Sequence, residues 1–468
     1  MTTESPETRP ALSRSRRWLR RLLVAAVAVI VAYGLLFIAL KSKLRSIERD
    51  VAARGESLDF ADIIPPELDR ATPNASDRLE AMALIAEGQE AVYLPRGKAP
   101  ADLEELQQRL REITWERTAI GDADLELFRR TVERHRLVLE VFDASRSISA
   151  ARDKTNYDAL PAAVIIPNLL PRLRLAMLVR ARAHTAIADA RFDDAWLDAA
   201  GILRLASWVG GEMPTLISAL VARAITRQGT ELVRCLAEVS PPTSEQRRML
   251  VEEADRIEPL ELINSALMAE RSFVYSTLVD PRAPRDIDLT DLSVEPPWRN
   301  VLLMRPWLWI NAALYVGPAT SIFEACIRPS YQHEEDLAGR IDELKPSTWA
   351  LPPQEFFYDC SDVSHKRDDW VAILDLMELG LRLEAARDGE GEVPQSLAAL
   401  GGELPLDPFS NEPYRYRRKN GGYVLYSVSA NRVDDGGVPT PLTEDKTPDL
   451  GRGDIVWEVS LHSEGRPG

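Results

Sequence analysis

The sequence predicts a mainly α-helical protein with an N-terminal transmembrane helix and a C-terminal α+β module, in which one long helix lies on a small antiparallel sheet. Three observations predict this fold: an uncharged apolar run near the N-terminus, apolar residues at helical spacing over most of the chain, and short aromatic segments separated by turns beyond residue 404. With 468 residues and 45% hydrophobic content, the chain can bury more than one core, because single cores stop growing at roughly 250 to 300 residues. We therefore expect at least two folded units.

Residues 22–40 form the predicted membrane anchor. They contain no charged or strongly polar side chain, and a helix of this length just covers a hydrocarbon core of about 30 Å. The basic residues that precede the run are Arg14, Arg16, Arg17, Arg20 and Arg21, and those that follow it are Lys41, Lys43 and Arg45. This bias favours a basic cytoplasmic tail at 1–21 and a periplasmic body. Because the long apolar run leads directly into Lys41 without a cleavage site, we expect an uncleaved single-pass signal anchor in the inner (cytoplasmic) membrane.

Residues 41–73 are predicted to form a charged helical stalk followed by a loop. Residues 74–345 are predicted to form an all-helical body with a proline-rich loop at 280–297. Within the body, residues 172–209 form two predicted helices joined by a turn at 191–194. This pair resembles a tetratricopeptide hairpin. A repeat array needs several such units, and the sequence shows one clear instance, so a helical bundle and a short tetratricopeptide-like solenoid both stay open.

A second apolar run covers residues 301–317 and carries Trp307, Trp309 and Tyr315, which are residue types common at membrane interfaces. Arg305 interrupts this run. We expect a helix buried in the body, with contact at the membrane interface as the alternative. The Gly317-Pro318 pair predicts a break in the helical block that contains the run.

The C-terminal module is predicted over residues 356–460, with a tail at 461–468. A long helix at 356–387 carries one apolar face, formed by Trp370, Ile373, Leu374, Met377 and Leu381. Predicted strands follow at 414–418, 423–428 and 454–459. Asn420-Gly421-Gly422 supplies the positive φ that a tight hairpin turn requires.

The order of these motifs resembles the globular domain of type II secretion major pseudopilins over roughly residues 366–460. The motifs are the long helix, Val393-Pro394, the turn Leu404-Pro405-Leu406-Asp407-Pro408-Phe409, Tyr414-Arg415-Tyr416, Tyr426-Ser427 and Asp454-Ile455. The resemblance implies a helix packed across a small antiparallel sheet. In pseudopilins the apolar segment is part of this same helix and carries a glutamate, whereas here it lies about three hundred residues upstream and contains no acid. The whole chain resembles membrane-anchored envelope proteins of planctomycete-like bacteria.

The pseudopilin resemblance implies a calcium site in the last loop, where Asp434, Asp435 and Asp454 are the matching carboxylates. Asn431-Arg432 stands where that family has Asp-Gly, and a cation would be repelled by Arg432. The alternative is that these acids are solvated turn residues.

No zinc site is predicted. A zinc site normally uses a close Cys-x-x-Cys or His-x-x-x-His pair. No such pair is formed by the four candidate residues, which are Cys326, His333, Cys360 and His365. The three cysteines, Cys235, Cys326 and Cys360, indicate no disulfide framework, although one bridge stays possible.

A net charge of -16 argues against a nucleic-acid partner, because phosphate binding depends on lysine and arginine. The sequence contains no phosphate-binding loop and no nucleophile elbow. We therefore expect a non-catalytic membrane-anchored envelope protein that contacts the lipid bilayer and binds or scaffolds a protein partner, in a secretion or pilus-like system. The alternative is a membrane-anchored hydrolase with an active site in the helical body that leaves no motif in the sequence.

Overall fold

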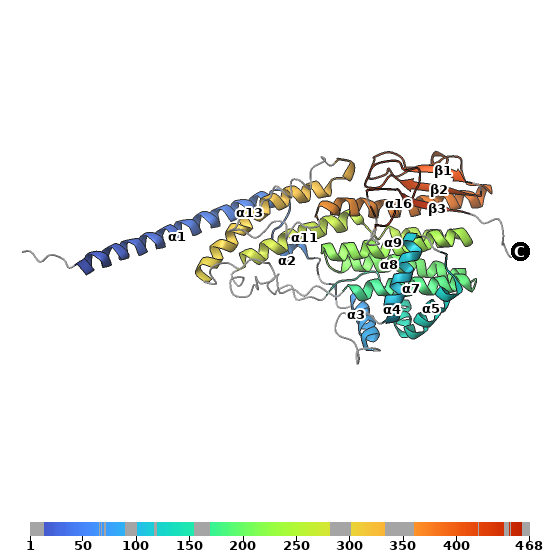
Figure 1. The fold of residues 1–468 in the computed structure, drawn as a ribbon, viewed down its shortest axis with the longest axis horizontal. Coiled ribbons are helices and arrows are strands. Elements are labelled where there is room, and N and C mark those ends of the chain that lie inside the picture. The colour runs from blue at the N-terminus through green and yellow to red at the C-terminus, as the bar shows by residue number, and fades with distance from the viewer. Residues whose placement is uncertain are drawn as a thin grey trace, which may run out of the picture.

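The computed structural model describes residues 14–460 apart from 65, 67, 70–71, 89–100, 117–118, 154–168, 281–300, 333–359, 420, 444–448 and 450. The protein is mainly helical, with a small three-stranded antiparallel sheet. A helical rod, α1, projects from a globular part, and the sheet lies at the opposite end of the molecule from the free end of α1 (Figure 1). The predicted mainly helical fold class is confirmed at this level.

The helices of the described residues are α1 (Arg14–Ala52), α2 (Phe60–Ile63), α3 (Ala75–Gly88), α4 (Ala101–Glu116), α5 (Asp122–Arg134), α6 (Arg136–Ser145), α7 (Leu170–Ala188), α8 (Phe192–Glu212), α9 (Leu216–Val239), α10 (Ser244–Ala254), α11 (Pro259–Val279), α13 (Val301–Ile327) and α16 (Cys360–Glu390). Short 3-10 helices lie at Ser330–Gln332 and Leu397–Leu400. The strands are β1 (Arg415–Lys419), β2 (Gly422–Ser427) and β3 (Ile455–Val459).

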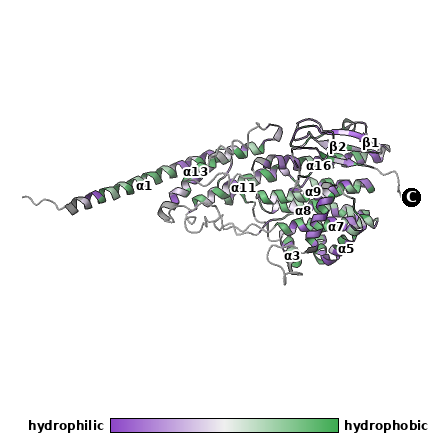
Figure 2. Ribbon diagram, in the orientation of Figure 1, coloured by the Kyte–Doolittle hydropathy of each residue, from purple (hydrophilic) through white to green (hydrophobic). Residues whose placement is uncertain are grey.

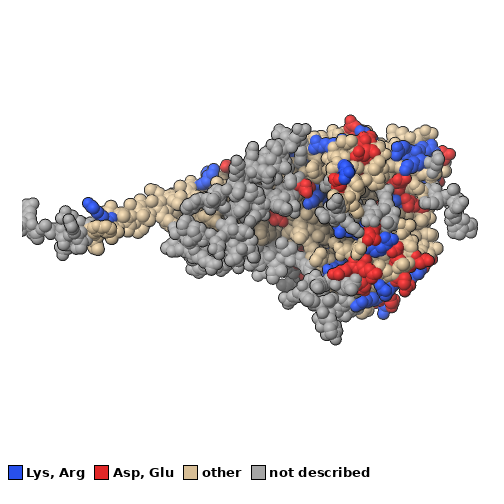
Figure 3. Space-filling view, viewed as in Figure 1, with Lys and Arg blue, Asp and Glu red and all other residues tan. Residues whose placement is uncertain are grey.

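The helix α1 contains both the predicted anchor and the predicted charged stalk without interruption. Its apolar part is exposed and mostly hydrophobic (Figure 2), and charged side chains gather instead on the globular part (Figure 3). Towards its C-terminal end, α1 packs against the body through one apolar stripe. This stripe is formed by Phe37, Leu40, Leu44, Ile47 and Val51. The spacing of three and four residues in this stripe is that of a helix packed along one face. The predicted apolar N-terminal helix is therefore present and long enough to cross a membrane.

The centre of the body is formed by α7, α8 and α9, which bury their small and aliphatic side chains against one another. Gly229 allows α8 and α9 to approach closely, since a Cβ there would lie 3.0 Å from Leu203. The turn between α7 and α8 lies at residues 189–191, so the prediction of 191–194 was wrong. Asp193 and Asp194 instead occupy the first turn of α8, where their charge suits the helix dipole.

Two helix boundaries differ from those that apolar spacing indicates. The chain from Asp122 to Ser145 forms two helices, α5 and α6, because the backbone leaves the helical region at His135, with φ −101° and ψ 22°. Conversely, α13 continues through Gly317 and Pro318, where a break was predicted. Buried contacts of α13 on both sides of the proline, at Val316 and Ala319, stabilise the continuous helix.

The C-terminal module has the predicted arrangement of a long helix against an antiparallel sheet in the order β1-β2-β3. Tyr416 pairs with Leu425 in the first ladder, and Leu425 pairs with Trp457 in the second. The turn after β1 uses Gly421 at φ +78°. Gly380 of α16 faces the sheet so closely that a Cβ there would lie 2.6 Å from the indole nitrogen of Trp457.

The same helix α16 also packs on α9, α11 and α13, so one hydrophobic core continues from the body into the sheet. The boundaries of the predicted domains, the pseudopilin resemblance and the tetratricopeptide-like repeat are not tested by this arrangement and stay predictions. The proline-rich loop at 280–297 falls almost entirely outside the described residues.

Candidate functional site: an arginine-lined cavity

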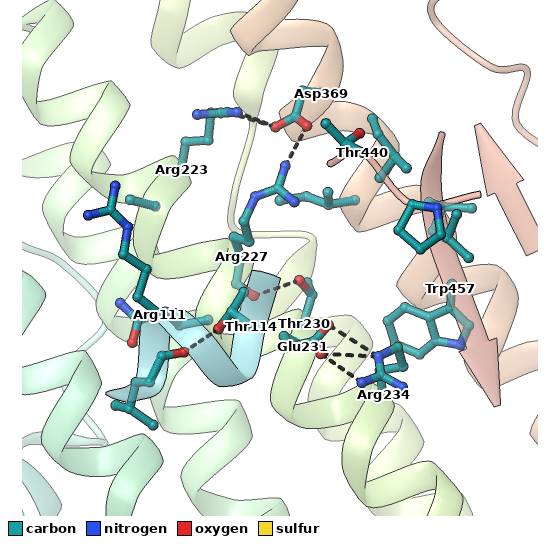
Figure 4. Close-up of a pocket in the computed structure, with 18 of the residues that line it drawn as sticks. Arg111, Thr114, Arg223, Arg227, Thr230, Glu231, Arg234, Asp369, Thr440 and Trp457 are labelled. Carbon is teal, nitrogen blue, oxygen red and sulfur yellow. Dashed lines mark hydrogen bonds and ion pairs between the residues drawn. The ribbon is translucent and has the colours of Figure 1, made fainter. Parts of the chain in front are cut away.

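A cavity of about 480 Å3 lies where the helical body meets the C-terminal sheet. Its wall is formed by α4, α7, α9, α16, β3 and the loop at residues 439–440, which are far apart in the sequence. Figure 4 shows Arg223 and Arg227 of α9 pointing to Asp369 of α16, with Trp457 of β3 across the cavity. The volume is within the usual range of small-molecule sites, roughly 300 to 1,000 Å3.

The helix α9 supplies a stripe of arginines to this wall. Arg223, Arg227 and Arg234 are four and seven residues apart, so they fall on one face of the helix. The opposite face is buried through residues such as Ile225 and Val233. The first turn of α9 is fixed by Thr215, whose hydroxyl accepts a hydrogen bond from the Ser218 amide at 3.2 Å. Packing of the apolar face therefore directs the arginines into the cavity.

Two of these arginines share one carboxylate. Arg223 Nε lies 2.8 Å from Asp369 Oδ2, and Arg227 contacts the other carboxylate oxygen of Asp369. Asp369 is buried, which by itself raises its pKa, but the two guanidinium groups outweigh burial and hold the pKa below its usual range. Asp369 is therefore ionised, and it compensates two cations with a single negative charge.

Arg180 of α7 is a buried cation on the same wall. It forms no ion pair with a carboxylate of the described residues, and the charge of Glu231 acts on it without direct contact. Its side chain is 1% exposed, and its one hydrogen bond goes from Nη1 to the hydroxyl of Thr114 at 2.6 Å. Within the part of the chain that the structure describes, its Nε and Nη2 atoms have no hydrogen-bond partner. Burial lowers the pKa of the guanidinium, but arginine remains the residue that keeps its charge best in proteins.

The charge of Arg180 affects the pKa of His184, which lies one turn further along α7. Burial, followed by the charge of Arg180, lowers the pKa of His184 to about 3, so this imidazole is neutral at physiological pH. His184 stacks on Phe128 at 5.9 Å between ring centroids. It is therefore a structural residue, and the positive charge in this region belongs to Arg180.

The remainder of the wall is partly apolar. Leu110, Leu173 and Ile373 line the cavity together with the indole of Trp457. Arg111 of α4 is exposed at the wall and forms no ion pair with the described residues. A bound molecule would thus meet cationic groups on one side and apolar side chains on the other.

Five arginines and three acids line the cavity, so its wall carries a net charge of +2 in a protein whose total charge is -16. The three acids already have partners: Asp369 is bound by two arginines, Glu231 is bound by Arg234 at 2.7 Å, and Asp454 accepts the Gly437 amide at 2.7 Å. No histidine is among the described residues of the wall. The arrangement is suited to binding an anion rather than to transferring protons.

The predicted calcium ligands lie beside the sheet, and only Asp454 reaches the cavity wall. Asp434 accepts hydrogen bonds from the Tyr426 hydroxyl and the Gly436 amide, each at 3.0 Å. Asp435 accepts the Gly453 amide at 2.8 Å. Each carboxylate is thus bound by groups of the chain itself. Within the described residues no group of three or more His, Cys, Asp or Glu side chains is arranged to hold a metal ion, and calcium binding stays a prediction.

Of the residues considered for zinc, His333 and the side chain of Cys360 lie outside the described residues. Cys235 is a free thiol. Burial raises the pKa of Cys235 to about 11 and that of Cys326 to about 12, so both are protonated at neutral pH and are poor nucleophiles.

Comparisons with protein-family models, with curated proteins and with solved structures find no match to this chain. The cavity arginines were not predicted from the sequence. The usable signal was the spacing of Arg223, Arg227 and Arg234 on a helix whose other face is apolar. The burial of Arg180 leaves no such local signal.

Proposed function

We propose that this chain is a membrane-tethered, non-catalytic envelope protein that holds an anionic group of its partner in the arginine-lined cavity. The observation that carries the proposal is Arg180, a guanidinium 1% exposed with two nitrogen atoms that have no hydrogen-bond partner among the described residues. A buried charge without a partner destabilises a fold by several kcal/mol. A carboxylate or phosphate bound in the cavity would place negative charge beside the Arg180 guanidinium.

The proposal gives a site to the partner-binding role predicted from the sequence. The apolar side chains of the wall, such as Leu173 and Trp457, favour an organic anion over a small inorganic ion. The hydrolase alternative, and a place in a secretion or pilus-like system, rest on the sequence alone. Nothing in the cavity adds support for either.

The membrane part of the proposal is that α1 spans the inner membrane once, with residues 1–21 in the cytoplasm and the body in the periplasm. In a bacterial host, protease added to spheroplasts should digest the body together with a periplasmic control. If the body stayed protected while that control was cut, the orientation would be the reverse.

Anion binding is tested by thermal unfolding of the full chain in detergent. Sodium phosphate and sodium succinate should each raise the melting temperature relative to sodium chloride at equal ionic strength, because a ligand at about 100 times its Kd stabilises the native state by about 2.7 kcal/mol. With Arg111→Ala, roughly ten times more anion should be needed for the same rise in melting temperature, because the substitution removes a charge from the wall.

The matched control is Arg130→Ala. Arg130 is also an exposed arginine, but it pairs with Glu105 and does not line the cavity. Its substitution should leave the anion response unchanged. Equal responses to phosphate, succinate and chloride in the wild-type protein would overturn the proposed function.

A further inference from the structure

We infer that the first half of α13 is embedded in the periplasmic half of the bilayer beside α1, where its outer face contacts lipid. This inference rests on the membrane-spanning part of the proposed function and is independent of the cavity. The contacts between α1 and the body begin at Phe37, before the end of the apolar run at Leu40.

The body begins to contact α1 inside the apolar run. Phe37 lies three residues before Leu40, and its ring packs on Trp309 of α13 with 4.6 Å between centroids. At 1.5 Å per residue, Trp309 is therefore about 4 Å deeper in the membrane than the end of the run. This is the depth at which tryptophan side chains are enriched in membrane proteins.

The two helices run parallel. Phe37 contacts Trp309, and Arg54 forms an ion pair of 2.6 Å with Glu324, so position along α13 increases together with position along α1. The two contacts are about 25 Å apart along α1, which fixes the register over a long interface. Residues of α13 that precede Trp309 must consequently lie deeper in the bilayer. In this register Trp307 is level with Leu35, and Ile310 is level with Ile38.

The face of α13 that points away from the body is apolar. Trp307 and Ile310 are partly exposed, and Leu314 is 56% exposed. Their spacing of three and four residues places them on one side of the helix. In water this stripe would be an unfavourable surface, whereas at the depth set by the register it meets acyl chains and the lipid interface.

Two polar groups at the same level lack acceptors among the described residues. Arg305 stacks its guanidinium over the Trp309 ring at 5.3 Å, and neither Arg305 Nε nor Trp309 Nε1 has a hydrogen-bond partner. Both unpartnered nitrogens are shielded by the protein itself, so polar contact with lipid is left to the exposed part of the half-buried Arg305 side chain. An arginine and a tryptophan at an interface are a common pair of anchors.

The body cannot move away from this position without breaking contacts to α1. Glu48 accepts the Tyr275 hydroxyl of α11 at 2.9 Å, and Glu56 binds Arg271 at 2.6 Å. These contacts fix α11 antiparallel to α1, so the N-terminal end of α11 is the end farthest from the membrane. Leu260, 53% exposed near that end, lies roughly 40 Å beyond the apolar run and is a matched control for Leu314.

The test is photolabelling of the full chain in lipid vesicles with a phospholipid that carries a diazirine on its acyl chain, followed by tryptic digestion and mass spectrometry. Peptide 22–41 reports the anchor, peptide 300–340 reports α13, and peptide 257–271 is the control that contains Leu260. We expect peptide 300–340 to be labelled at roughly one third of the yield of peptide 22–41, because one face of α13 meets lipid. Within it, the label should lie on Trp307 and Ile310, and peptide 257–271 should stay unlabelled.

Label on 22–41 alone would overturn the inference and leave the anchor intact. Label on neither peptide would refute the membrane-spanning helix itself. Equal label on 300–340 and 257–271 would show non-specific association of the body with lipid, and this outcome would also overturn the inference.

Discussion

Two aspartates on opposite faces of α16, the buried Asp369 and the half-buried Asp375, have pKa values shifted in opposite directions. On the face toward the helical body, Asp369 is bound by Arg223 and Arg227, and its pKa lies below the usual range. On the face toward the sheet, six residues further along, Asp375 accepts the Tyr414 hydroxyl at 2.8 Å, and burial raises its pKa to about 7. The same side chain on the same helix is thus ionised in one region and half protonated near neutral pH in the other.

The difference shows that the balance of acidic and basic side chains is not the same on the two sides of α16. The body side holds more arginine than acid around the cavity. On the sheet side Asp375 and Asp407 form no ion pair with the described residues, and Glu384 pairs with Arg387 alone. Glu384 follows the pattern of Asp375, since burial raises its pKa to about 7, and burial also raises the pKa of Asp407. The cavity is therefore short of negative charge, which is the property that the proposed function uses.

The largest expected effect comes from removing the carboxylate that the cavity arginines share. Asp369→Asn leaves Arg223 and Arg227 without their anion in a buried wall, and it should lower the free energy of unfolding by about 4 kcal/mol. Urea denaturation of the full chain in detergent measures this change. A loss below about 1 kcal/mol would show that the wall does not depend on Asp369.

The next effect is a pH dependence on the sheet side. Because the folded pKa values of Asp375 and Glu384 are raised to about 7, the native state binds more protons than the unfolded chain between about pH 4 and pH 7. Stability should therefore fall as pH rises through this window, by on the order of 2 kcal/mol for each group. The melting temperature should be higher at pH 5 than at pH 8.

Substituting Asp375→Asn separates this effect from other titrations. The amide keeps the shape of the carboxyl group and can still accept the Tyr414 hydrogen bond, but it does not titrate. The difference in melting temperature between pH 5 and pH 8 should shrink by about half, because Glu384 continues to titrate. An unchanged difference would mean that Asp375 has an ordinary pKa in the folded protein.

The smallest effect is expected at the exposed end of the same helix. Asp388 binds Arg247 at 2.7 Å, and its side chain is 44% exposed, so solvent screens this ion pair. Asp388→Asn should change the free energy of unfolding by less than about 1 kcal/mol. A loss as large as that of Asp369→Asn would remove the distinction between the buried and exposed pairs of α16.

Features that depend on local pattern could be predicted from the sequence. The apolar length of α1, the helical period of the body and the glycine turn at Gly421 each indicate one element, and each element is present. The break at His135 has no signal in the apolar spacing, which continues across it. The continuous helix at Gly317 and Pro318 was missed because its packing on distant segments outweighs the local signal for a break.

The candidate site could not be predicted in the same way. Its wall joins residues from Arg111 to Trp457, and only the tertiary fold brings them together. Arg180 has no sequence signal, because burial of one arginine in a helix depends on what the other helices cover. The aspartates of the last loop could be placed near one another from the sequence, but their engagement by Tyr426 and by backbone amides could not.

The most direct test of the account is the free energy of unfolding of Arg180→Met and of the wild-type protein, each measured with and without saturating sodium phosphate. Methionine fills similar space without charge, so without phosphate the variant should be more stable than wild type by on the order of 2 kcal/mol. Phosphate should raise the free energy of unfolding of the wild-type protein and leave that of the variant unchanged. The stability advantage of the variant should therefore become smaller or reverse. If Arg180→Met were instead less stable without phosphate and responded to phosphate as wild type does, Arg180 would be a structural residue and the cavity would not be an anion site.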